Sequence, residues 1–600
     1  MKILGLSFFY HDSAAALVVD GVPVAMAEEE RFSRKKHDSG FPSSAIQFVL
    51  AEGGIAIADL DYVIFYERPF LKLERVLKTA LAVFPWAPGA FVRSVKSEFV
   101  SKIWIRACIA KETGIDAGKI LFSEHHLSHA AASFLTSPYE KAAILTVDGV
   151  GEWACTAIGI GEGNAIRMLK EIHFPHSIGL LYSAFTAFLG FTVNEGEYKV
   201  MGMAPYGVPR YEAKIKKLIT FFDDGSFALD LKYFSFHRSA TKTYSREFVK
   251  LFGEPRDPQS KFFTRDSGWP SYFGERPREQ EFSSMARRQE YYADLAASLQ
   301  KVTEDVITRL AKEAFRITGC DVLCIGGGVA LNSVANWKII QGTPFRETFI
   351  QPAAGDSGGA LGAALFLSNT VLREPRRFLM KHAYYGQSFS HDEVRDFLAR
   401  HCIEAEYIAD EDDLVATVTE EIIDGRVIGW FQGRFEWGPR ALGNRSILAD
   451  PRRSDMKDIV NTKIKFREPY RPFAPSVLQE HVEEFFEIPD SVQHFPGRFM
   501  LYVVDVKEKK RNEIPAITHV NGTGRLQIVF REESPLYHKL ISAFYAKTGI
   551  PLLLNTSFNL RGEPIVTTPE DAWNTFMRSG IDTLVLDHFI VRKEHCHESH

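Results

Sequence analysis

Two segments of this chain share one pattern, in which an apolar strand leads to an acidic residue and is followed by a hairpin. The first segment is expected to form strands at residues 2–7, 14–19 and 22–27. Its last two strands are joined at Asp20-Gly21, a dipeptide typical of tight hairpin turns. The second segment begins with a strand at 142–147 that ends at Asp148, and continues with a strand at 153–160 and another after it. The repetition predicts a duplicated α/β fold, as in actin-like ATPases.

The length of 600 residues predicts more than one domain, because a single hydrophobic core does not grow to that size. A helix is expected at 291–317 and a buried strand at 321–325. The polar stretch 372–390 is a natural boundary, so we place one domain at 1–375 and a second at 385–600. Within the first domain, residues 208–290 resemble an insertion. Its residues 237–285 are loop-like and rich in Pro, Arg and Ser, and an insertion of that length is more often functional than idle.

The charge balance argues against large anionic partners. Lys and Arg number 71, Asp and Glu 76, and the net charge is −5, whereas nucleic-acid and anionic membrane surfaces require an excess of cations. No apolar run approaches the roughly 20 residues that span a bilayer. The six cysteines are scattered, which suits a reducing compartment. We expect a cytoplasmic protein without nucleic-acid or membrane partners.

Two histidines and two aspartates form a predicted metal site. His125 and His129 are four residues apart, which places both imidazoles on one face of a helix. Asp148 ends a buried strand and Asp356 lies in a glycine-rich turn, so in a duplicated fold both would face the same cleft. A mixed nitrogen and oxygen set suits Fe, Zn or Mn better than Mg or Ca. The alternatives are packed histidines, and aspartates that cap helices or turns.

Glycine-rich turns predict a nucleotide site in the first domain. Gly326, Gly327 and Gly328 follow a buried strand, and their amides, with Asn332 shortly after, would approach a nucleotide. A second glycine-rich turn lies at 355–359. Each turn alone is weak evidence, because glycine triplets also serve tight packing.

The second domain concentrates cations beside glycine turns and neutral donors. Arg440 and Arg445 lie within the Gly-Pro turn 438–446, and the segment 463–473 adds four more cations. Arg forks, a Lys point charge and neutral donors are what several phosphates require. The alternative is a solvated surface. Further along, Arg525 follows the glycine turn 519–524, and the strand that starts at Leu552 runs into a turn with Asn555 and Ser557.

Taken together, these motifs resemble the O-carbamoyltransferases of antibiotic, toxin and nodulation-factor biosynthesis, of the tobramycin carbamoyltransferase type. The resemblance covers nearly the whole chain and rests on the His125/His129 pair and on segments 10–14, 29–38, 195–207, 326–332, 438–446, 466–475 and 555–559. It implies an actin-like, duplicated ribonuclease-H-like N-terminal domain. It also implies a YrdC-like α/β C-terminal domain. In that domain the phosphates and the carbamoyl group would be held by Arg440, Lys465, Arg471, Arg525, Asn555 and Ser557.

The resemblance implies an ATP-dependent O-carbamoyltransferase. ATP, with Mg²⁺, and carbamoyl phosphate would form carbamoyl-AMP in the second domain, and the first would transfer the carbamoyl group to a hydroxyl of a small-molecule acceptor. The metal would be Fe(II) or another divalent transition metal on His125, His129, Asp148 and Asp356. His11 would be the base, with Asp12 and Lys36 in the catalytic group. The acceptor, the native metal and the oligomeric state, with a homodimer among the options, stay open.

Three other functions fit less well. A threonylcarbamoyl-type tRNA-modifying enzyme would use the same two domains, but the chain lacks a basic excess. An actin-like sugar kinase needs an Asp-x-Gly-Thr phosphate loop after the first strand, and residues 8–13 do not match it. A nucleotide-switched scaffold would leave the histidine pair and the arginines of the second domain without a role.

Overall fold

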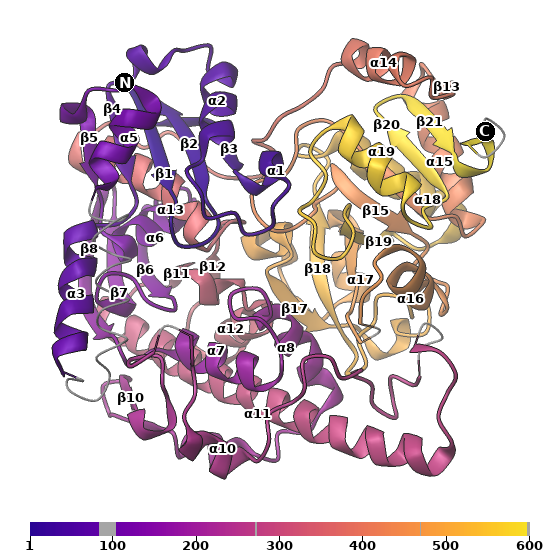
Figure 1. The fold of residues 1–600 in the computed structure, drawn as a ribbon. Helices are drawn as coiled ribbons and strands as arrows, with labels where there is room; N and C mark the ends of the chain where they lie inside the picture. Colours follow the sequence, from indigo (N-terminus) through magenta and orange to yellow (C-terminus); the bar gives the residue numbers. More distant parts are fainter. Residues whose placement is uncertain (83–103, 240, 270–272, 469, 597–600) are drawn as a thin grey trace. The chain divides into compact units, whose positions relative to one another are not determined.

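The computed structural model describes residues 1–82, 104–239, 241–269, 273–468 and 470–596. The chain divides into two compact units, whose elements are labelled in Figure 1. Unit 1 comprises Met1–Glu29, His37–Lys261 and Arg288–Met380, and unit 2 comprises Glu30–Lys36, Phe262–Arg287 and Lys381–His600. The segment predicted as an insertion at 208–290 is therefore divided between the units.

The first sheet of unit 1 has the strand order β3-β2-β1-β4-β5. Strands β1 (Lys2–Ser7), β2 (Ala14–Val19) and β3 (Val22–Glu28) form an antiparallel meander. Strands β4 (Tyr62–Phe65) and β5 (Ile120–Phe122) continue the sheet parallel to β1. Asp20 and Gly21 have φ angles of 50° and 79°, the left-handed pair that a type I′ turn requires. The predicted hairpin is confirmed.

The second sheet repeats the arrangement of the first. Strands β6 (Lys141–Val147), β7 (Ala154–Glu162) and β8 (Ala165–His173) are antiparallel. Strands β11 (Val322–Gly326) and β12 (Glu347–Phe349) extend the sheet parallel to β6. Read from β8, the order β8-β7-β6-β11-β12 matches that of the first sheet in position and direction. This repetition confirms the duplicated, ribonuclease-H-like α/β fold.

Two corresponding helices pack closely between the repeats. Helix α6 (His125–Phe134) follows the last strand of the first sheet, and α13 (Asp356–Leu365) follows the last strand of the second. A Cβ atom added to Gly362 would lie 1.9 Å from the carbonyl oxygen of Ser128. Glycine at this position therefore allows α13 to approach α6 more closely than any side chain would permit.

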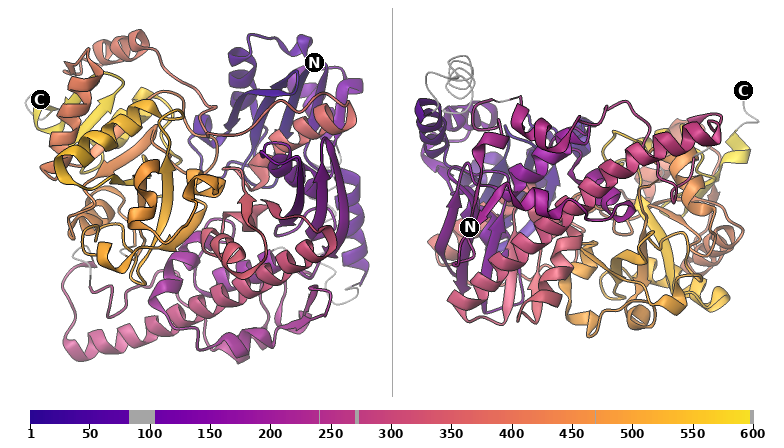
Figure 2. Two further views of the ribbon diagram at one scale, coloured as in Figure 1. Left: turned by 180° about the vertical axis from the view of Figure 1, so that it is seen from behind. Right: turned by 90° about the horizontal axis from the view of Figure 1, so that it is seen from below.

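The remaining elements of unit 1 surround these layers. A small hairpin is formed by β9 (Ile219–Phe221) and β10 (Phe227–Leu229). Among the described residues of unit 1, further α-helices are α2 (Ser43–Glu52), α3 (Pro69–Ala82), α5 (Ile105–Thr113), α7 (Ile178–Phe188), α8 (Glu197–Met203), α9 (Glu212–Lys216), α10 (Arg246–Phe252) and α12 (Ser333–Gly342). Helix α11 (Glu279–Thr318) belongs to unit 2 up to Arg287 and to unit 1 from Arg288. It begins at Glu279 rather than at the predicted residue 291, and Figure 2 shows it as one long helix. Its first turns are rich in Glu and Arg, so apolar periodicity did not mark them.

Unit 2 is an α/β unit on a nine-stranded mixed sheet of order β13-β21-β20-β14-β15-β19-β16-β18-β17. Its strands are β13 (Glu406–Tyr407), β14 (Ile428–Phe431), β15 (Arg445–Ala449), β16 (Ala474–Leu478), β17 (Tyr502–Asp505), β18 (Thr523–Val529), β19 (Leu552–Ser557), β20 (Thr583–Leu586) and β21 (Phe589–Arg592). Its helices include α1 (Glu30–Ser33), α14 (His391–Arg400), α15 (Glu411–Ile423), α16 (Met456–Ile459), α17 (Val482–Phe485), α18 (Pro535–Thr548) and α19 (Pro569–Met577). The central strands are almost entirely buried.

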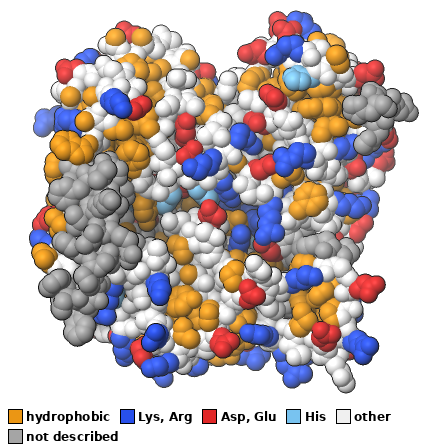
Figure 3. Space-filling view, in the orientation of Figure 1, with side chains coloured by type: hydrophobic (Ala, Val, Ile, Leu, Met, Phe, Trp, Pro, Cys, Tyr) orange, Lys and Arg blue, Asp and Glu red, His pale blue; other side chains and the backbone are white. Residues whose placement is uncertain are grey.

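Within the described parts of the chain, no helix combines the length and the apolar character that a bilayer crossing needs. On the face shown in Figure 3, Lys and Arg side chains are interspersed with Asp and Glu. That face therefore offers no broad area of a single charge.

Candidate functional site

Helix α6 places two histidines at one point in unit 1. His125 is its first residue and His129 lies one turn later, so both rings project from the same side. Their Nε2 atoms are 3.1 Å apart, and both side chains are buried. The carboxylate of Glu152 accepts the backbone N–H of His125 at 3.0 Å, which satisfies a free donor at the helix N-terminus.

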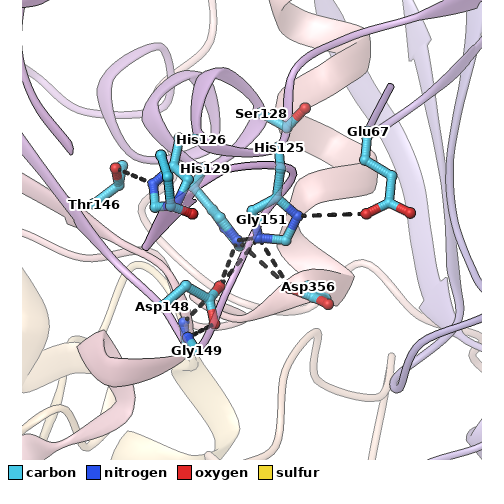
Figure 4. A network of polar contacts seen from close by, with 12 residues as sticks. Glu67, His125, His126, Ser128, His129, Thr146, Asp148, Gly149, Gly151 and Asp356 are labelled. Carbon is cyan, nitrogen blue, oxygen red and sulfur yellow. Dashed lines mark hydrogen bonds and ion pairs between the residues drawn. The ribbon is translucent and has the colours of Figure 1, made fainter. Parts of the chain in front are cut away.

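Two aspartates from the second repeat meet the histidines, as Figure 4 shows. Asp148 directly follows β6, and its Oδ2 lies 2.9 Å from Nε2 of His129 and 3.3 Å from Nε2 of His125. Asp356 is the first residue of α13, and its Oδ1 lies 3.5 Å from Nε2 of His129. One ligand atom from each of the four residues lies within 4.8 Å of the others. The structure thus brings the four predicted metal ligands together.

The chemistry of this cluster fits a divalent transition metal. Two imidazole nitrogens and two carboxylate oxygens converge, and among the described residues Oδ1 of Asp356 has no hydrogen-bond partner although it is buried. Burial raises the pKa of Asp148, but hydrogen bonds from His125 and His129 hold that pKa well below its usual range. Burial lowers the pKa of His129, whereas Asp148 and Asp356 raise it, to about 9. In the protein alone, the carboxylates are therefore balanced by a proton that a cation would replace.

Other side chains hold the four residues in place. The Tyr66 hydroxyl donates to Oδ2 of Asp356 at 3.2 Å. Glu67 lies 3.9 Å from Nδ1 of His125 and forms a buried ion pair with Lys72 at 2.8 Å. Such outer contacts orient metal-binding imidazoles. The sequence analysis missed these residues, although Tyr66 and Glu67 directly follow β4 as Asp148 follows β6.

His11 and Asp12 lie in the loop that follows β1, beside this cluster. Asp12 accepts from Nδ1 of His11 at 2.8 Å and from Nδ1 of His37 at 2.7 Å. Nε2 of His11 is 3.8 Å from Oδ2 of Asp356. Burial lowers the pKa of His11, but Asp356 and Asp12 raise it, to about 10. The Nε2 side of the predicted base therefore faces the cluster.

His37 was not predicted, although it lies within the segment 29–38 that carried the resemblance. The backbone of His37 and that of Asp12 both have a φ angle of 54°, an uncommon conformation outside glycine. Lys36, which was predicted beside His11, belongs to unit 2. The structure does not bring Lys36 together with His11 within one unit.

The glycine triplet lies against the same cluster. The N–H of Gly327 donates to the carbonyl of Ala354 at 2.9 Å, and that of Gly328 donates to Asp148 at 3.3 Å. A Cβ atom on Gly327 would lie 2.3 Å from the carbonyl oxygen of Val147, so glycine is required for this close approach. Asn332 caps α12 by accepting the N–H of Ala335. These amides bond within the protein, and their role toward a nucleotide stays a prediction.

In unit 2, Lys465 is buried among oxygen acceptors. Its Nζ donates to Oδ1 of Asn559 at 2.7 Å and to Oγ of Ser557 at 3.2 Å, and its side chain is only 3% exposed. Burial, together with the charges of Arg467, Arg471 and Lys36, lowers the pKa of Lys465 well below its usual range. The positive charge of Lys465 is therefore poorly neutralised by the surrounding protein.

Arg525 on β18 belongs to the same group of charges. Burial and the neighbouring charges of Arg440, Arg467 and Arg471 lower the pKa of Arg525 well below its usual range. The structure thus gathers the predicted cations of unit 2 into one cluster, which we call the cation cluster: Arg440, Lys465, Arg467, Arg471 and Arg525. Mutual repulsion of like charges in a buried place is relieved when a polyanion binds.

Arg445 differs from Arg440, with which the sequence analysis grouped it. Its guanidinium is fully buried and donates to backbone carbonyls, including that of Gly433 at 3.1 Å. Glu436, which was not predicted, accepts the N–H groups of Leu442, Asn444 and Arg445 through one oxygen. Arg445 and Glu436 therefore shape the turn that carries Arg440.

The cation cluster predicts acid-sensitive folding. Burial and the charges of Arg525 and Lys457 lower the pKa of His519 from 6.5 to about 3. Below pH 6.5 the unfolded chain binds a proton at His519 that the folded chain rejects, so its contribution to the free energy of unfolding falls by up to about 1.4 kcal/mol per pH unit. In urea denaturation between pH 6.5 and 4.5, His519→Gln is expected to lose stability less steeply than the wild type. Parallel curves for the two proteins would rule this out.

Comparisons with known proteins identify the family of the chain. The family model described as "Carbamoyltransferase N-terminus" matches residues 2–365, and "Carbamoyltransferase C-terminus" matches residues 419–593. The uncharacterized protein sll1178 from Synechocystis sp. is 43% identical, covering 98% of this chain and 96% of that protein. The nodulation protein NolNO from Sinorhizobium fredii is 38% identical, covering 98% and 79%.

A third relative carries an activity in its name. The 3'-hydroxymethylcephem-O-carbamoyltransferase from Streptomyces clavuligerus is 36% identical, covering 42% of this chain and 44% of that enzyme. The two family models together span most of both units. On this evidence the chain belongs to the carbamoyltransferase family and is an enzyme of that class.

Proposed function

We propose that this carbamoyltransferase forms carbamoyl-AMP from ATP and carbamoyl phosphate in unit 2, and transfers the carbamoyl group to a hydroxyl of a small molecule in unit 1. The cation cluster is the observation that carries the proposal. It holds several cations in one buried place, where Lys465 also contacts the hydroxyl of Ser557. A triphosphate and a phosphorylated carbamoyl donor supply the matching negative charge.

Adenylation would give the carbamoyl group a good leaving group. Carbamate is a poor acyl donor, because its oxygen is a poor leaving group until it is esterified to phosphate. In the proposed first step, water cleaves carbamoyl phosphate, phosphate leaves and carbamate remains. The carboxylate oxygen of carbamate then attacks the α-phosphorus of ATP and pyrophosphate leaves. The role of Lys465, Arg471 and Arg525 is to hold the phosphates and to stabilise the charge that develops on them.

Transfer would take place beside the His/Asp cluster of unit 1. The acceptor oxygen attacks the carbamoyl carbon, AMP leaves, and Nε2 of His11 takes the hydroxyl proton. Asp12 accepts from Nδ1 of His11 and orients the ring. A cation bound to Asp356 would offset the carboxylate charge that raises the pKa of His11, so that Nε2 could act as the base. Held by His125, His129, Asp148 and Asp356, a divalent transition metal such as Fe(II) would supply Lewis-acid polarisation of the carbamoyl carbonyl.

The acceptor class follows from the relatives alone. The name of the Streptomyces clavuligerus relative denotes O-carbamoylation of a hydroxymethyl group. An alcohol is a weak nucleophile at neutral pH, which is the reason to place an imidazole base beside it. The proposal therefore extends to hydroxylated small molecules as a class.

The test is to supply ATP, Mg²⁺, Fe²⁺ and carbamoyl phosphate, and to follow pyrophosphate release together with carbamoyl-AMP by mass spectrometry. The wild type is expected to form carbamoyl-AMP. Arg471→Ala is expected to form it roughly 100-fold more slowly, because a charged contact to phosphate is lost. Arg453→Ala is the matched control, since that guanidinium pairs with Asp455 at the surface.

Two results would contradict the proposal. One is a wild type that releases no pyrophosphate, even when a mixture of hydroxylated acceptors is present. The other is an Arg471→Ala variant that keeps the rate of the wild type.

A further inference from the structure

Three neighbouring strands of unit 2 present polar side chains on one face. Ser476 on β16 is paired with Gln527 on β18, and β16 also pairs with β19, which carries Asn555. Alternate residues of a strand point the same way, so Arg525 shares the face of Gln527, and Ser557 shares the face of Asn555. The polar group Ser476, Gln527 and Asn555 therefore continues the face that carries part of the cation cluster.

A fixed backbone acceptor determines the orientation of Gln527. The carbonyl of Leu442 accepts only, and the Nε2 atom of Gln527 lies 2.7 Å from it. The amide of Gln527 must therefore turn its Oε1 the other way, where it accepts from the hydroxyl of Ser476 and from Asn555. The side chain of Gln527 is 3% exposed, so water does not compete for these bonds.

Gln527 in turn determines the orientation of Asn555. The Nδ2 atom of Asn555 lies 3.0 Å from Oε1 of Gln527, 3.0 Å from Oγ of Ser476 and 3.3 Å from the carbonyl of Ala441. Turning the amide over would place its oxygen against two other oxygens. The Oδ1 atom of Asn555 must therefore face away from this group.

In that orientation, Oδ1 of Asn555 is a buried acceptor with no hydrogen-bond partner among the described residues, and the side chain is 1% exposed. Leaving such an acceptor unpaired costs about 1–3 kcal/mol. A ligand that brings an N–H donor to this point would recover that energy. A phosphate on the same ligand would lie near Ser557, two residues along the same strand, whose hydroxyl contacts Lys465.

We propose that Gln527 is a positioning residue that fixes the amide of Asn555, so that Oδ1 accepts from the NH₂ group of the carbamoyl donor and selects it over acyl donors. This inference rests on the proposed function. In carbamoyl phosphate, only a carbon and an oxygen separate the nitrogen from phosphorus. Asn555 and Ser557 are about 7 Å apart along the strand, which matches so compact a ligand. The amino group of adenine lies too far from the ATP phosphates to serve both.

Carbamoyl phosphate and acetyl phosphate provide the test, because they differ by NH₂ against CH₃ at nearly equal size. We would titrate each into the full-length protein by calorimetry at low temperature. The wild type is expected to bind carbamoyl phosphate about 10-fold more tightly or better, because acetyl phosphate leaves Oδ1 unpaired. Gln527→Met is expected to bring this ratio close to 1 by weakening carbamoyl phosphate alone.

Acetyl phosphate serves as the internal control, since its unchanged affinity shows that the variant is folded and that the phosphate contacts are intact. Gln432→Met is the matched variant: Gln432 is also buried and donates to a backbone carbonyl, that of Asp587 at 2.8 Å, and its ratio is expected to stay that of the wild type. Equal affinities in the wild type, or an unchanged ratio in Gln527→Met, would overturn the inference. If neither compound binds the wild type, the proposed function fails as well, and this result is distinct from a lost ratio.

Discussion

His129→Ala is expected to purify without its transition metal and to lose carbamoyl transfer, while it still forms carbamoyl-AMP. His129 has the shortest contact of the cluster, 2.9 Å to Asp148, and one ring nitrogen facing both aspartates. Substitutions of outer contacts around metals cost about 10- to 100-fold, so loss of a direct ligand is expected to reduce transfer by roughly 100-fold or more. The measurements are metal content by mass spectrometry and AMP release with a mixture of acceptors, compared with pyrophosphate release.

His126→Gln is the matched control for this variant. His126 lies on the same helix and is equally buried, but its ring bonds to Thr146 at 2.7 Å and to the carbonyl of Ala154 at 2.9 Å, away from the cluster (Figure 4). It is expected to retain both the metal and transfer. If His129→Ala keeps its metal, or if adenylation falls together with transfer, the division of labour between the units is wrong.

Lys465→Met is expected to show the opposite result, with metal retained and adenylation lost. The substitution keeps a long apolar stem but removes the one ammonium that contacts both Ser557 and Asn559. Loss of a fixed charge at the reacting phosphates costs about 100- to 1,000-fold in rate. Pyrophosphate release at saturating ATP and carbamoyl phosphate measures the effect.

Lys463→Met controls for the loss of a positive charge in the same turn. Lys463 is exposed, whereas Lys465 is buried, so only Lys465 is expected to matter. Equal losses in the two variants would mean that the turn acts through its general charge. Chemically supplied carbamoyl-AMP should restore transfer in Lys465→Met, because the His/Asp cluster in unit 1 is untouched.

The convergence of the four predicted metal ligands could be predicted from the sequence, because each lies at a position that the fold fixes. His125 and His129 share a helix face, and Asp148 directly follows a buried strand. Asp356 begins the helix after the last strand of the second repeat, as His125 does in the first, so its position could be predicted once the repeat is recognised. The duplicated fold could be predicted for the same reason, since strand periods and the Asp20-Gly21 turn are local signals.

Residues that act through tertiary contacts left no such local signal. His37 reaches Asp12 from a separate loop, and Gln527 acquires its meaning only from the carbonyl of Leu442. Arg445 and Arg440 look alike in the sequence, yet Arg445 bonds to backbone carbonyls inside the turn. Burial and the direction of a side chain decide these roles, and a residue pattern encodes neither.

The packing of α6 against α13 ties the cohesion of unit 1 to the chemistry of its cluster. Each repeat supplies half of the donor set, so a cation held by all four residues also fastens one repeat to the other. Its binding free energy is then part of the work needed to pull the repeats apart. Removal of the ion by a chelator is therefore expected to weaken the packing of one repeat against the other. A methyl group at Gly362 would push α13 away from α6 and so weaken ion binding, although Gly362 is not one of the four ligands.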